Sequence, residues 1–495
     1  MPFRNTACTS APLEAPPNMP LRFELPQPLT QALAKQHIEY EFVSTDPVCP
    51  YENCTINTDL LDVDMVLLIV LQDSLGQMQF LLPANRLIDV RRLSEQNGRN
   101  LQAAPATTLQ LLAAAQGLPT AQTSLAAIPQ TQAAAVQACT SLRERSILYV
   151  TTGITDVFLK ITGDSLDRYL AHVVYSDFTA PVDDLWTQLR EDAGEKRLFD
   201  AVSHFTTRRI YQRLDKTLEI PPMSETAKRI VKLRSDPMAS VRDLAQIVEV
   251  DPSLAAHVVS WASSSYYNAP GGIRSVNDAV VRVLGFDLVM NLALGLSLSN
   301  TLDMPTDGPR DIIPYWQQAV FTAALTEALV KRMARKERPS VGLAYLIGLL
   351  NNFGFFILGF VFRSFFSLIS RFIEANPHHS HAVIEQYVLG ISREHICAWV
   401  MTQWDMPEAV ITALRWQHIP EYNGKHSTYV QLLYVANQLV QRIHKPEPAF
   451  ELRHRPISPS LLAQLDLTPE ALYEALSYVV ARKSELMKMA DMLER

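Results

Sequence analysis

The first third of the chain carries short apolar runs separated by polar stretches, a pattern typical of β-strands. The runs are rich in β-branched and aromatic residues, which favour extended structure. They are HIEYEFV, VLLIVL, QFLLP, SILYV and DVFLKI, between His37 and Ile161. Helices are expected in two stretches between them, TLQLLAAAQ and the Ala- and Gln-rich TQAAAVQACTSL. We therefore predict a mixed α/β domain over residues 29–175, preceded by a loose Pro-rich leader at 1–28.

From about residue 220 the strand pattern stops and helix starts follow one another. Three of these starts carry capping chemistry: Ser240 with Asp243, Ser275 with Asp278, and Asp251 with Pro252. Apolar residues repeat at helical spacing behind the caps. We predict an all-α domain over 211–442, joined to the first domain by a helical linker at 176–210. A helical tail at 443–495 is expected to pack on this body or on another subunit.

One stretch without charges, Pro339 to Phe362, is long enough to cross a bilayer. However, Asn351, Asn352 and four glycines interrupt it. Two core helices joined at Asn-Asn-Phe-Gly explain the same pattern, and we favour them over a membrane span. The two amides need partners there, because a buried polar side chain without a hydrogen bond costs about 1–3 kcal/mol.

Composition supports a folded protein of two or three domains, since 495 residues exceed what one core usually holds. A net charge of -7 argues against a strongly basic nucleic-acid-binding protein. Five scattered cysteines fit a reducing, cytoplasmic compartment, and the N-terminus has no apolar signal segment. Cys49 and Cys54 lack a second pair at ligand spacing, so we interpret them as half-buried thiols rather than a zinc site.

Seven motifs follow one another between Tyr211 and Arg442. They are EIPPMSETAKRIVKL, VRDLAQIVEVDPSLAAHVVSWASSSYYN, IRSVNDAVVRVLGFDLVMNLAL, YWQQA, GLLNNFG, HICAWVMTQWDMPEAVITALRWQH and YVANQLV. In this order they resemble the HDOD family, a group related to HD-type metal-dependent phosphohydrolases. Pro222, Asp251-Pro252, Ser264 and Gly285 stand where the family pattern expects them. The resemblance implies an all-α fold and a place in bacterial signalling.

The HD enzymes hold divalent metal with a His, a His-Asp doublet and a later Asp. By this resemblance the four positions fall on Gln318, Asn351, Asn352 and Asn437. Neutral amides are poor ligands for a catalytic divalent metal, whose Lewis acidity metal-dependent hydrolysis needs. We therefore expect no metal, no cofactor and no hydrolytic site. The amides either bond one another as a link between helices, which we favour, or line a pocket for a small polar ligand.

Several histidines lie in the same region. His395 and His418 match positions where the family carries histidines, and we take them as candidates for a groove near the amides. His378, His379 and His381 form a cluster at a predicted loop-to-helix start. We interpret that cluster as exposed loop histidines rather than a metal site.

The N-terminal domain resembles, more loosely, the YbaK and prolyl-tRNA-synthetase-associated family of aminoacyl-tRNA deacylases. The motifs behind this are QHIEYEFV, DVDMVLLIVL, QFLLPANRLIDVRRLSEQNG, GLPTAQTSLAAIP and TTGITDVFLKITGDSL. The family carries an active-site lysine where this chain has Val63, Asp64 and Met65. A carboxylate at Asp64 cannot supply the cation of a lysine. The Gly-x-x-Pro-Gly type loop is reduced to Gly117–Thr120. We expect this deacylase position to be degenerate.

Together these features predict a non-catalytic signalling protein, a pseudoenzyme that binds a protein partner or a small ligand and that could form oligomers. The alternative is an enzyme, either an aminoacyl-tRNA deacylase or a residual metal-dependent phosphohydrolase. A third hypothesis, RNA binding without chemistry, depends on four scattered arginines, Arg86, Arg91, Arg92 and Arg99. A solvated helix face explains those arginines equally well.

Overall fold

The structure is a computed structural model with side chains, and it describes most of the chain. The described residues are 27–35, 37–44, 55–56, 64–115, 117, 135–153, 157–170, 173–191, 200–201, 223–267, 272–299, 307–310, 313–334, 338–363, 365–444 and 457–493. The predictions for Cys8, Cys49, Cys54, Val63, Pro222, Leu118–Thr120 and nearly all of the leader lie outside these residues.

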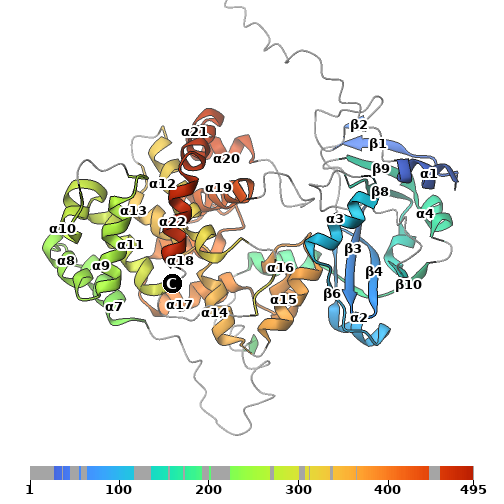
Figure 1. Ribbon diagram of the computed structural model, residues 1–495, viewed down its shortest axis with the longest axis horizontal. Coiled ribbons are helices and arrows are strands. Elements are labelled where there is room, and N and C mark those ends of the chain that lie inside the picture. The colour runs from blue at the N-terminus through green and yellow to red at the C-terminus, as the bar shows by residue number, and fades with distance from the viewer. Residues whose placement is uncertain are drawn as a thin grey trace, which may run out of the picture.

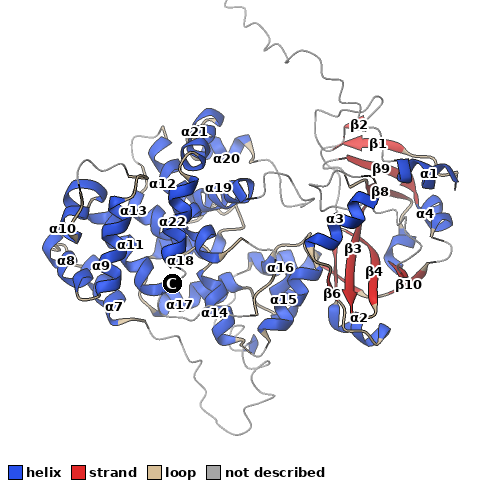
Figure 2. Ribbon diagram, viewed as in Figure 1, coloured by secondary structure: helices blue, strands red, loops and turns tan. Residues whose placement is uncertain are grey.

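An α/β body and a helical body lie next to each other, with α15 (Phe366–Ala375) and α16 (His381–Leu389) between them (Figure 1). Among the residues that the structure describes, strands are confined to the N-terminal part, and the rest is mainly helical (Figure 2). The predicted order, a mixed α/β domain, then an all-α domain and a helical C-terminus, is confirmed.

The α/β body is built on a mixed sheet that, within the described residues, has nine strands. The strand order is β10-β7-β4-β3-β8-β9-β1-β2, and β6 pairs with β3. The bounds are β1 (Glu41–Ser44), β2 (Thr55–Ile56), β3 (Met65–Asp73), β4 (Gly76–Pro83), β6 (Gln102–Ala103), β7 (Ala135–Cys139), β8 (Ile147–Thr151), β9 (Val157–Thr162) and β10 (Val174–Ser176). A second, two-stranded sheet pairs β5 (Arg86–Ile88) with β11 (Thr179–Pro181).

The five apolar runs all contribute to strands, and the central pair shows why. β3 and β4 form an antiparallel hairpin in the register Val66↔Pro83 to Asp73↔Gly76. Most residues of β3 are buried whichever face of the sheet they point to. This explains an unbroken apolar run in place of strict alternation, since a strand covered on both faces has no polar side.

The prediction of a helix over TQAAAVQACTSL is wrong. Ala135–Cys139 forms β7, which pairs in parallel with β4 and with β10. Its last two residues, Ala138 and Cys139, are fully buried. Intrinsic preference for a helix is worth only tenths of a kcal/mol per residue, so strand pairing and burial override it. The other Ala-rich stretch does form a helix, α3 (Ala106–Ala115).

The remaining helices cover the sheet, form the linker or build the helical body. Those of the first domain and linker are α1 (Gln27–Lys35), α2 (Val90–Asn97), α4 (Gly163–Tyr169) and α5 (Asp183–Arg190), with a 3-10 turn at Thr140–Glu144. Those of the body are α7 (Glu225–Arg234), α8 (Val241–Glu249), α9 (Pro252–Ser263), α10 (Val276–Asp278), α11 (Phe286–Ser299), α12 (Tyr315–Arg332), α13 (Val341–Leu349), α14 (Phe353–Val361), α17 (Arg393–Gln403), α18 (Glu408–Trp416) and α19 (Ser427–His444).

The predicted caps begin helices at the expected residues. Ser240 and Asp243 form a reciprocal capping box, and Asp251 caps α9 with Pro252 at its first position. Ser275 caps α10, but the carboxylate of Asp278 accepts from the backbone N–H of Arg274 instead of closing a box. A π-helical turn, Ala279–Leu284, follows α10 directly.

The uncharged stretch forms two core helices, as predicted. The segment Val341–Val361 has the length and mean hydropathy of a membrane span, 21 residues and 1.8, but it is divided into α13 and α14, and 89% of its most apolar window is buried in the protein. The protein's own core therefore accounts for its apolar character.

The C-terminal tail packs on the helical body of the same chain, one of the two predicted alternatives. It forms α20 (Pro459–Gln464), α21 (Pro469–Val480) and α22 (Lys483–Leu493), and the last two lie against α12 (Figure 1). Thr468 caps α21 through a bond from the backbone N–H of Ala471.

Candidate functional site

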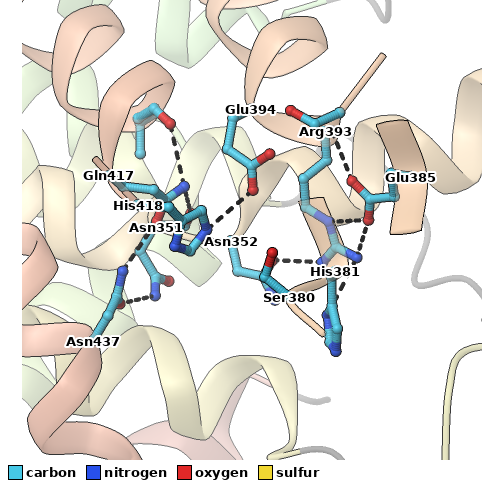
Figure 3. Close-up of polar contacts among 12 residues, drawn as sticks. Asn351, Asn352, Ser380, His381, Glu385, Arg393, Glu394, Gln417, His418 and Asn437 are labelled. Atoms are coloured by element: carbon cyan, nitrogen blue, oxygen red, sulfur yellow. Dashed lines mark hydrogen bonds and ion pairs between the residues drawn. The ribbon is translucent and has the colours of Figure 1, made fainter. Parts of the chain in front are cut away.

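The structure brings the four predicted amide positions together from three places in the fold. Gln318 lies on α12, Asn351 and Asn352 in the turn between α13 and α14, and Asn437 on α19. Asn351 Nδ2 donates to Asn437 Oδ1 at 3.0 Å, and Asn352 Nδ2 donates to Gln318 Oε1 at 3.4 Å. We call these four residues the amide cluster; Figure 3 shows its three asparagines with their neighbours.

Two glycines bring the helices of the cluster close together. A Cβ on Gly348 would lie 2.6 Å from Ala323 Cα of α12, and one on Gly354 would lie 2.7 Å from the carbonyl oxygen of Arg393 at the start of α17. Either contact is too short for any other residue. The glycines of the apolar run thus let α13 and α14 approach α12 and α17 closely enough for short amide side chains to meet.

A fifth amide, Gln417, fixes which way the first pair points. Its Nε2 donates to two backbone carbonyls, those of Asn351 at 2.9 Å and Leu414 at 3.2 Å, so its Oε1 must be the acceptor for Asn437 Nδ2, at 3.1 Å. Asn437 Oδ1 is then left to accept from Asn351 Nδ2. Each hydrogen bond in the chain from Asn351 to Asn437 to Gln417 therefore has a defined donor and acceptor, because the backbone carbonyls that Gln417 binds can only accept.

This chain ends in a buried acceptor. Asn351 is 4% exposed, and its Nδ2 is used by Asn437 and by Thr322 Oγ1 at 3.3 Å. Its Oδ1 is buried and accepts no hydrogen bond from any described residue. The interpretation of the amides as a link between helices therefore fits Gln318, Asn352 and Asn437 better than it fits Asn351, whose Oδ1 accepts no hydrogen bond from a described residue.

Asn352 is oriented from the other side by a buried ion pair. Arg393 Nη1 donates to Asn352 Oδ1 at 3.0 Å (Figure 3). Asn352 Nδ2 is then left to donate to Gln318. Arg393 in turn binds Glu385 of α16, with Nε 2.6 Å from Oε1 and its backbone N–H 2.8 Å from Oε2. Both side chains are almost fully buried, at 5% and 0% exposure. Burial raises the pKa of Glu385, against the lowering effect of the Arg393 charge.

A second acidic side chain stands beside the cluster. Glu394 is buried, and its Oε1 lies 3.2 Å from Nε2 of the partly exposed His418. Burial alone would raise the pKa of Glu394, but hydrogen bonding to His418, together with the charges of His418 and Arg393, lowers it overall. His418 therefore lies near the amides, as expected, and serves to hold a carboxylate charged inside the protein.

His395 does not lie with the amides in a groove. It is 5% exposed, its Nδ1 is 2.9 Å from Ser392 Oγ, and its Nε2 is 2.6 Å from Arg415 Nη2. The same Arg415 nitrogen donates to the carbonyl oxygens of Leu189 and Glu191, at the end of α5. The guanidinium of Arg415 therefore lies at the C-terminal end of the linker helix, where the negative end of the helix dipole favours a cation. His395 contacts this guanidinium and so helps to hold the helix.

The prediction of exposed loop histidines is wrong for His378 and His379. Each is only 5% exposed, and each Nε2 lies about 3 Å from the carbonyl oxygen of Arg86 in the first domain, at 2.9 and 3.0 Å. Their rings are 4.1 Å apart. The prediction failed because the two histidines are buried against strand β5. Arg86 of this strand lies 292 positions before His378 and 293 before His379 in the chain.

In the first domain, Asp64 is half-buried and directly precedes β3. The resemblance to the deacylase family stays a prediction. The four arginines considered for RNA have partners within the protein. Arg99 Nε binds Asp73 at 2.8 Å, Arg92 binds Asp177 at 3.1 Å, Arg86 binds Thr179 at 2.6 Å, and Arg91 lies over the ring of Phe372.

A polar cavity of about 570 Å³ opens at the junction of the two bodies. It is lined by the β3–β4 turn, the residues after α2, β6 and Arg310 of the helical body. Arg310 Nη2 donates to the carbonyl oxygen of Ala103 at 3.1 Å, and its guanidinium binds Glu374 of α15. Nine of the ten lining residues therefore belong to the α/β body, and one, Arg310, belongs to the helical body.

The donor set of the amide cluster does not fit a catalytic metal. Across the part of the chain that the structure describes, no group of three or more His, Cys, Asp or Glu side chains is arranged to hold a metal ion. The amides offer neutral oxygens, three of which accept from neighbouring side chains. Sequence reasoning missed Gln417, Thr322, Arg393 and Glu385. Gln417 could have been found as the neighbour of His418, and Thr322 as one turn after Gln318.

Known proteins resemble this chain over part of the helical body and over nearly its whole length. The model of the HDOD domain matches residues 220–420. A solved structure from Marinobacter aquaeolei VT8, provisionally described as a signal transduction protein, is 36% identical, covers 95% of this chain and 100% of its own, and has a TM-score of 0.81. A provisionally described phosphohydrolase from Shewanella amazonensis SB2B is 17% identical over 59% of this chain and 98% of its own, with a TM-score of 0.44.

Among curated proteins, an uncharacterised protein of Treponema pallidum is 20% identical over 235 residues. The match covers 47% of this chain and 44% of the Treponema protein, so the chain spans less than half of that relative. The likeness to the Marinobacter protein, in contrast, extends over both bodies of the structure.

Proposed function

Because this chain belongs to the HDOD family, we propose that it is a bacterial signalling protein that regulates by binding a protein or a small ligand and carries out no metal-dependent hydrolysis. The observation that carries this proposal is the amide cluster. Where the family resemblance places the metal ligands of the phosphohydrolases, this chain has two hydrogen-bonded amide pairs. Asn351 pairs with Asn437, which also bonds Gln417, and Asn352 pairs with Gln318.

The electrostatics of the cluster support the same proposal. A catalytic divalent cation is held by carboxylates and imidazoles, whose charge and nitrogen donors offset the loss of its hydration shell. The amide cluster supplies neither, and the nearby carboxylates of Glu385 and Glu394 are paired with Arg393 and His418. Binding a metal there would require breaking hydrogen bonds and buried pairs that hold the helices together.

The cavity at the domain junction supports small-ligand binding as one form of this regulation. Its volume of about 570 Å³ lies in the ordinary range of ligand sites, which often occur between domains. A ligand there would contact both bodies at once and would favour one arrangement of the two.

Metal analysis of the purified full-length protein tests the proposal. We expect less than one tightly bound iron, manganese or zinc per chain, and no phosphodiesterase activity when these metals are added. The variant Asn351→His/Asn352→Asp should remain inactive, because Gln318 and Asn437 would still be amides. Stoichiometric metal that is lost on replacing His378, His379 or His395 would overturn the proposal.

A separate assay addresses the deacylase alternative. Mischarged aminoacyl-tRNA is incubated with the wild type and with Asp64→Ala, and release of the amino acid is measured. We expect release at the background rate in both. Release by the wild type that Asp64→Ala abolishes would instead establish the N-terminal domain as an enzyme.

A further inference from the structure

The turn between α15 and α16 completes the open edge of a strand in the first domain. Asn376 is fully buried; its Oδ1 accepts from the backbone N–H of Ile88 at 2.5 Å, and its Nδ2 donates to the carbonyl of Ile88 at 3.0 Å. His378 and His379 bond the carbonyl of Arg86, two residues earlier on the same edge. These side chains make the hydrogen bonds that a neighbouring strand would make.

The next element, α16, contacts the first domain through Tyr387 and the linker through Gln386. Tyr387 donates its hydroxyl to Asp89 Oδ2 at 2.7 Å. The other oxygen of Asp89 caps α2 by accepting from the backbone N–H groups of Arg91 and Arg92. Gln386 Nε2 lies 3.0 Å from Gln188 Oε1 of α5. A shift of α2 or α5 would therefore act on α16 through these hydrogen bonds.

The opposite face of α16 holds the amide cluster. Glu385 and Tyr387 are two residues apart, about 200° around a helix, so they point in nearly opposite directions. Glu385 binds Arg393, which donates to Asn352 Oδ1 at 3.0 Å. Water cannot easily replace this pairing, because the side chains of Glu385 and Arg393 are buried, at 0% and 5% exposure.

We propose that α16 couples the two domains, so that a change at the β5–α2 edge of the first domain alters the packing of the amide cluster through Glu385 and Arg393. The inference rests on the proposed function, because it treats the amide cluster as a regulated site. It assigns the N-terminal domain the role of input, and Arg393 the role of a positioning residue for Asn352.

Hydrogen–deuterium exchange of the full chain tests the coupling. Tyr387→Phe removes one hydroxyl at the interface and keeps the ring. We expect exchange of the backbone amides at 349–354 to rise about 2- to 10-fold, the range that follows from the net free energy of one hydrogen bond. Tyr175→Phe is the matched control, because Tyr175 also donates to a carboxylate, Asp167, but within the first domain.

A second variant separates transmission from general destabilisation. In an Asn352→Ala background the link to Arg393 is absent, so the added effect of Tyr387→Phe at 349–354 should shrink toward none. Exchange in α8, away from the route, should stay unchanged throughout. Equal increases in both backgrounds, or no increase at all, would overturn the coupling. Metal content and hydrolysis are not read in this experiment, so its failure is distinct from failure of the proposed function.

Discussion

At the scale of single residues, the candidate site is built from buried side-chain pairs. Amides occupy the positions that the family resemblance assigns to metal ligands. The two carboxyl groups next to them, Glu385 and Glu394, are bonded to Arg393 and His418. The pairing of Glu394 with His418 is the one that pH can test, because folding lowers the pKa of Glu394 while His418 stays partly exposed.

We predict that Glu394→Gln lowers the free energy of unfolding by about 2 kcal/mol at pH 7, the value of a hydrogen bond to a charged group. A carboxyl whose pKa is lowered on folding binds its proton more readily in the unfolded chain, so acid favours unfolding. The contribution is fully present above the unfolded value of about 4.3 and is lost as the pH falls below it. Urea unfolding between pH 3 and pH 7 measures this.

The control for this variant is Glu249→Gln, an exposed carboxyl at the end of α8. Its stability should follow the wild-type pH profile. A constant difference between Glu394→Gln and the wild type at all pH values would contradict the proposed charged pairing.

At the scale of elements, close approach of helices decides where the amides lie. α13 packs on α12 with Gly348 against Ala323 Cα and Thr326 Oγ1, where an added Cβ would lie 2.6 and 2.7 Å away. The backbone of α12 and a hydroxyl held against that backbone line this contact, so neither can yield as a flexible side chain would.

We predict that Gly348→Ala lowers the free energy of unfolding by about 1–3 kcal/mol, the usual cost of overpacking a core, despite the better helix propensity of alanine. Thermal or urea unfolding measures the loss. Gly272→Ala is the control, because a Cβ there meets no atom within 4 Å and its stability should be close to wild type. Wild-type stability of Gly348→Ala would show that α13 can move away from α12 at little cost.

At the scale of the whole molecule, the two bodies are joined by specific polar contacts rather than by a linker alone. Asn376 is the centre of this joint, since its carboxamide satisfies both backbone groups of the fully buried Ile88. An edge strand left without partners exposes unpaired N–H and C=O groups, so the helical body protects the first domain at this edge.

We predict that Asn376→Leu, which keeps the branched shape of the side chain and removes both hydrogen-bonding groups, lowers the free energy of unfolding by about 2–5 kcal/mol, because two buried backbone groups lose their partners. Small-angle X-ray scattering should also show a larger radius of gyration as the bodies separate. Asn97→Leu, which breaks a bond to Gln137 inside the first domain, should leave the radius unchanged. An unchanged radius in Asn376→Leu would argue that apolar contacts alone hold the joint.

The sequence by itself determined what depends on neighbours along the chain. Strand runs such as VLLIVL, the capping box of Ser240 and Asp243, and the break of the apolar stretch at Asn351 and Asn352 all follow from local chemistry. The family resemblance added the four amide positions, and the order of α/β and all-α domains followed from the change in hydrophobic period.

Only the tertiary structure decided the features that need a distant partner. β7 is a strand because β4 lies beside it, and His378 and His379 are buried because they contact β5. Gln417, at the end of α18, sets the direction of the amide hydrogen bonds. These outcomes have one physical reason. Burial and backbone pairing outweigh the small local preferences of a residue, and they are supplied by segments whose approach no local pattern encodes.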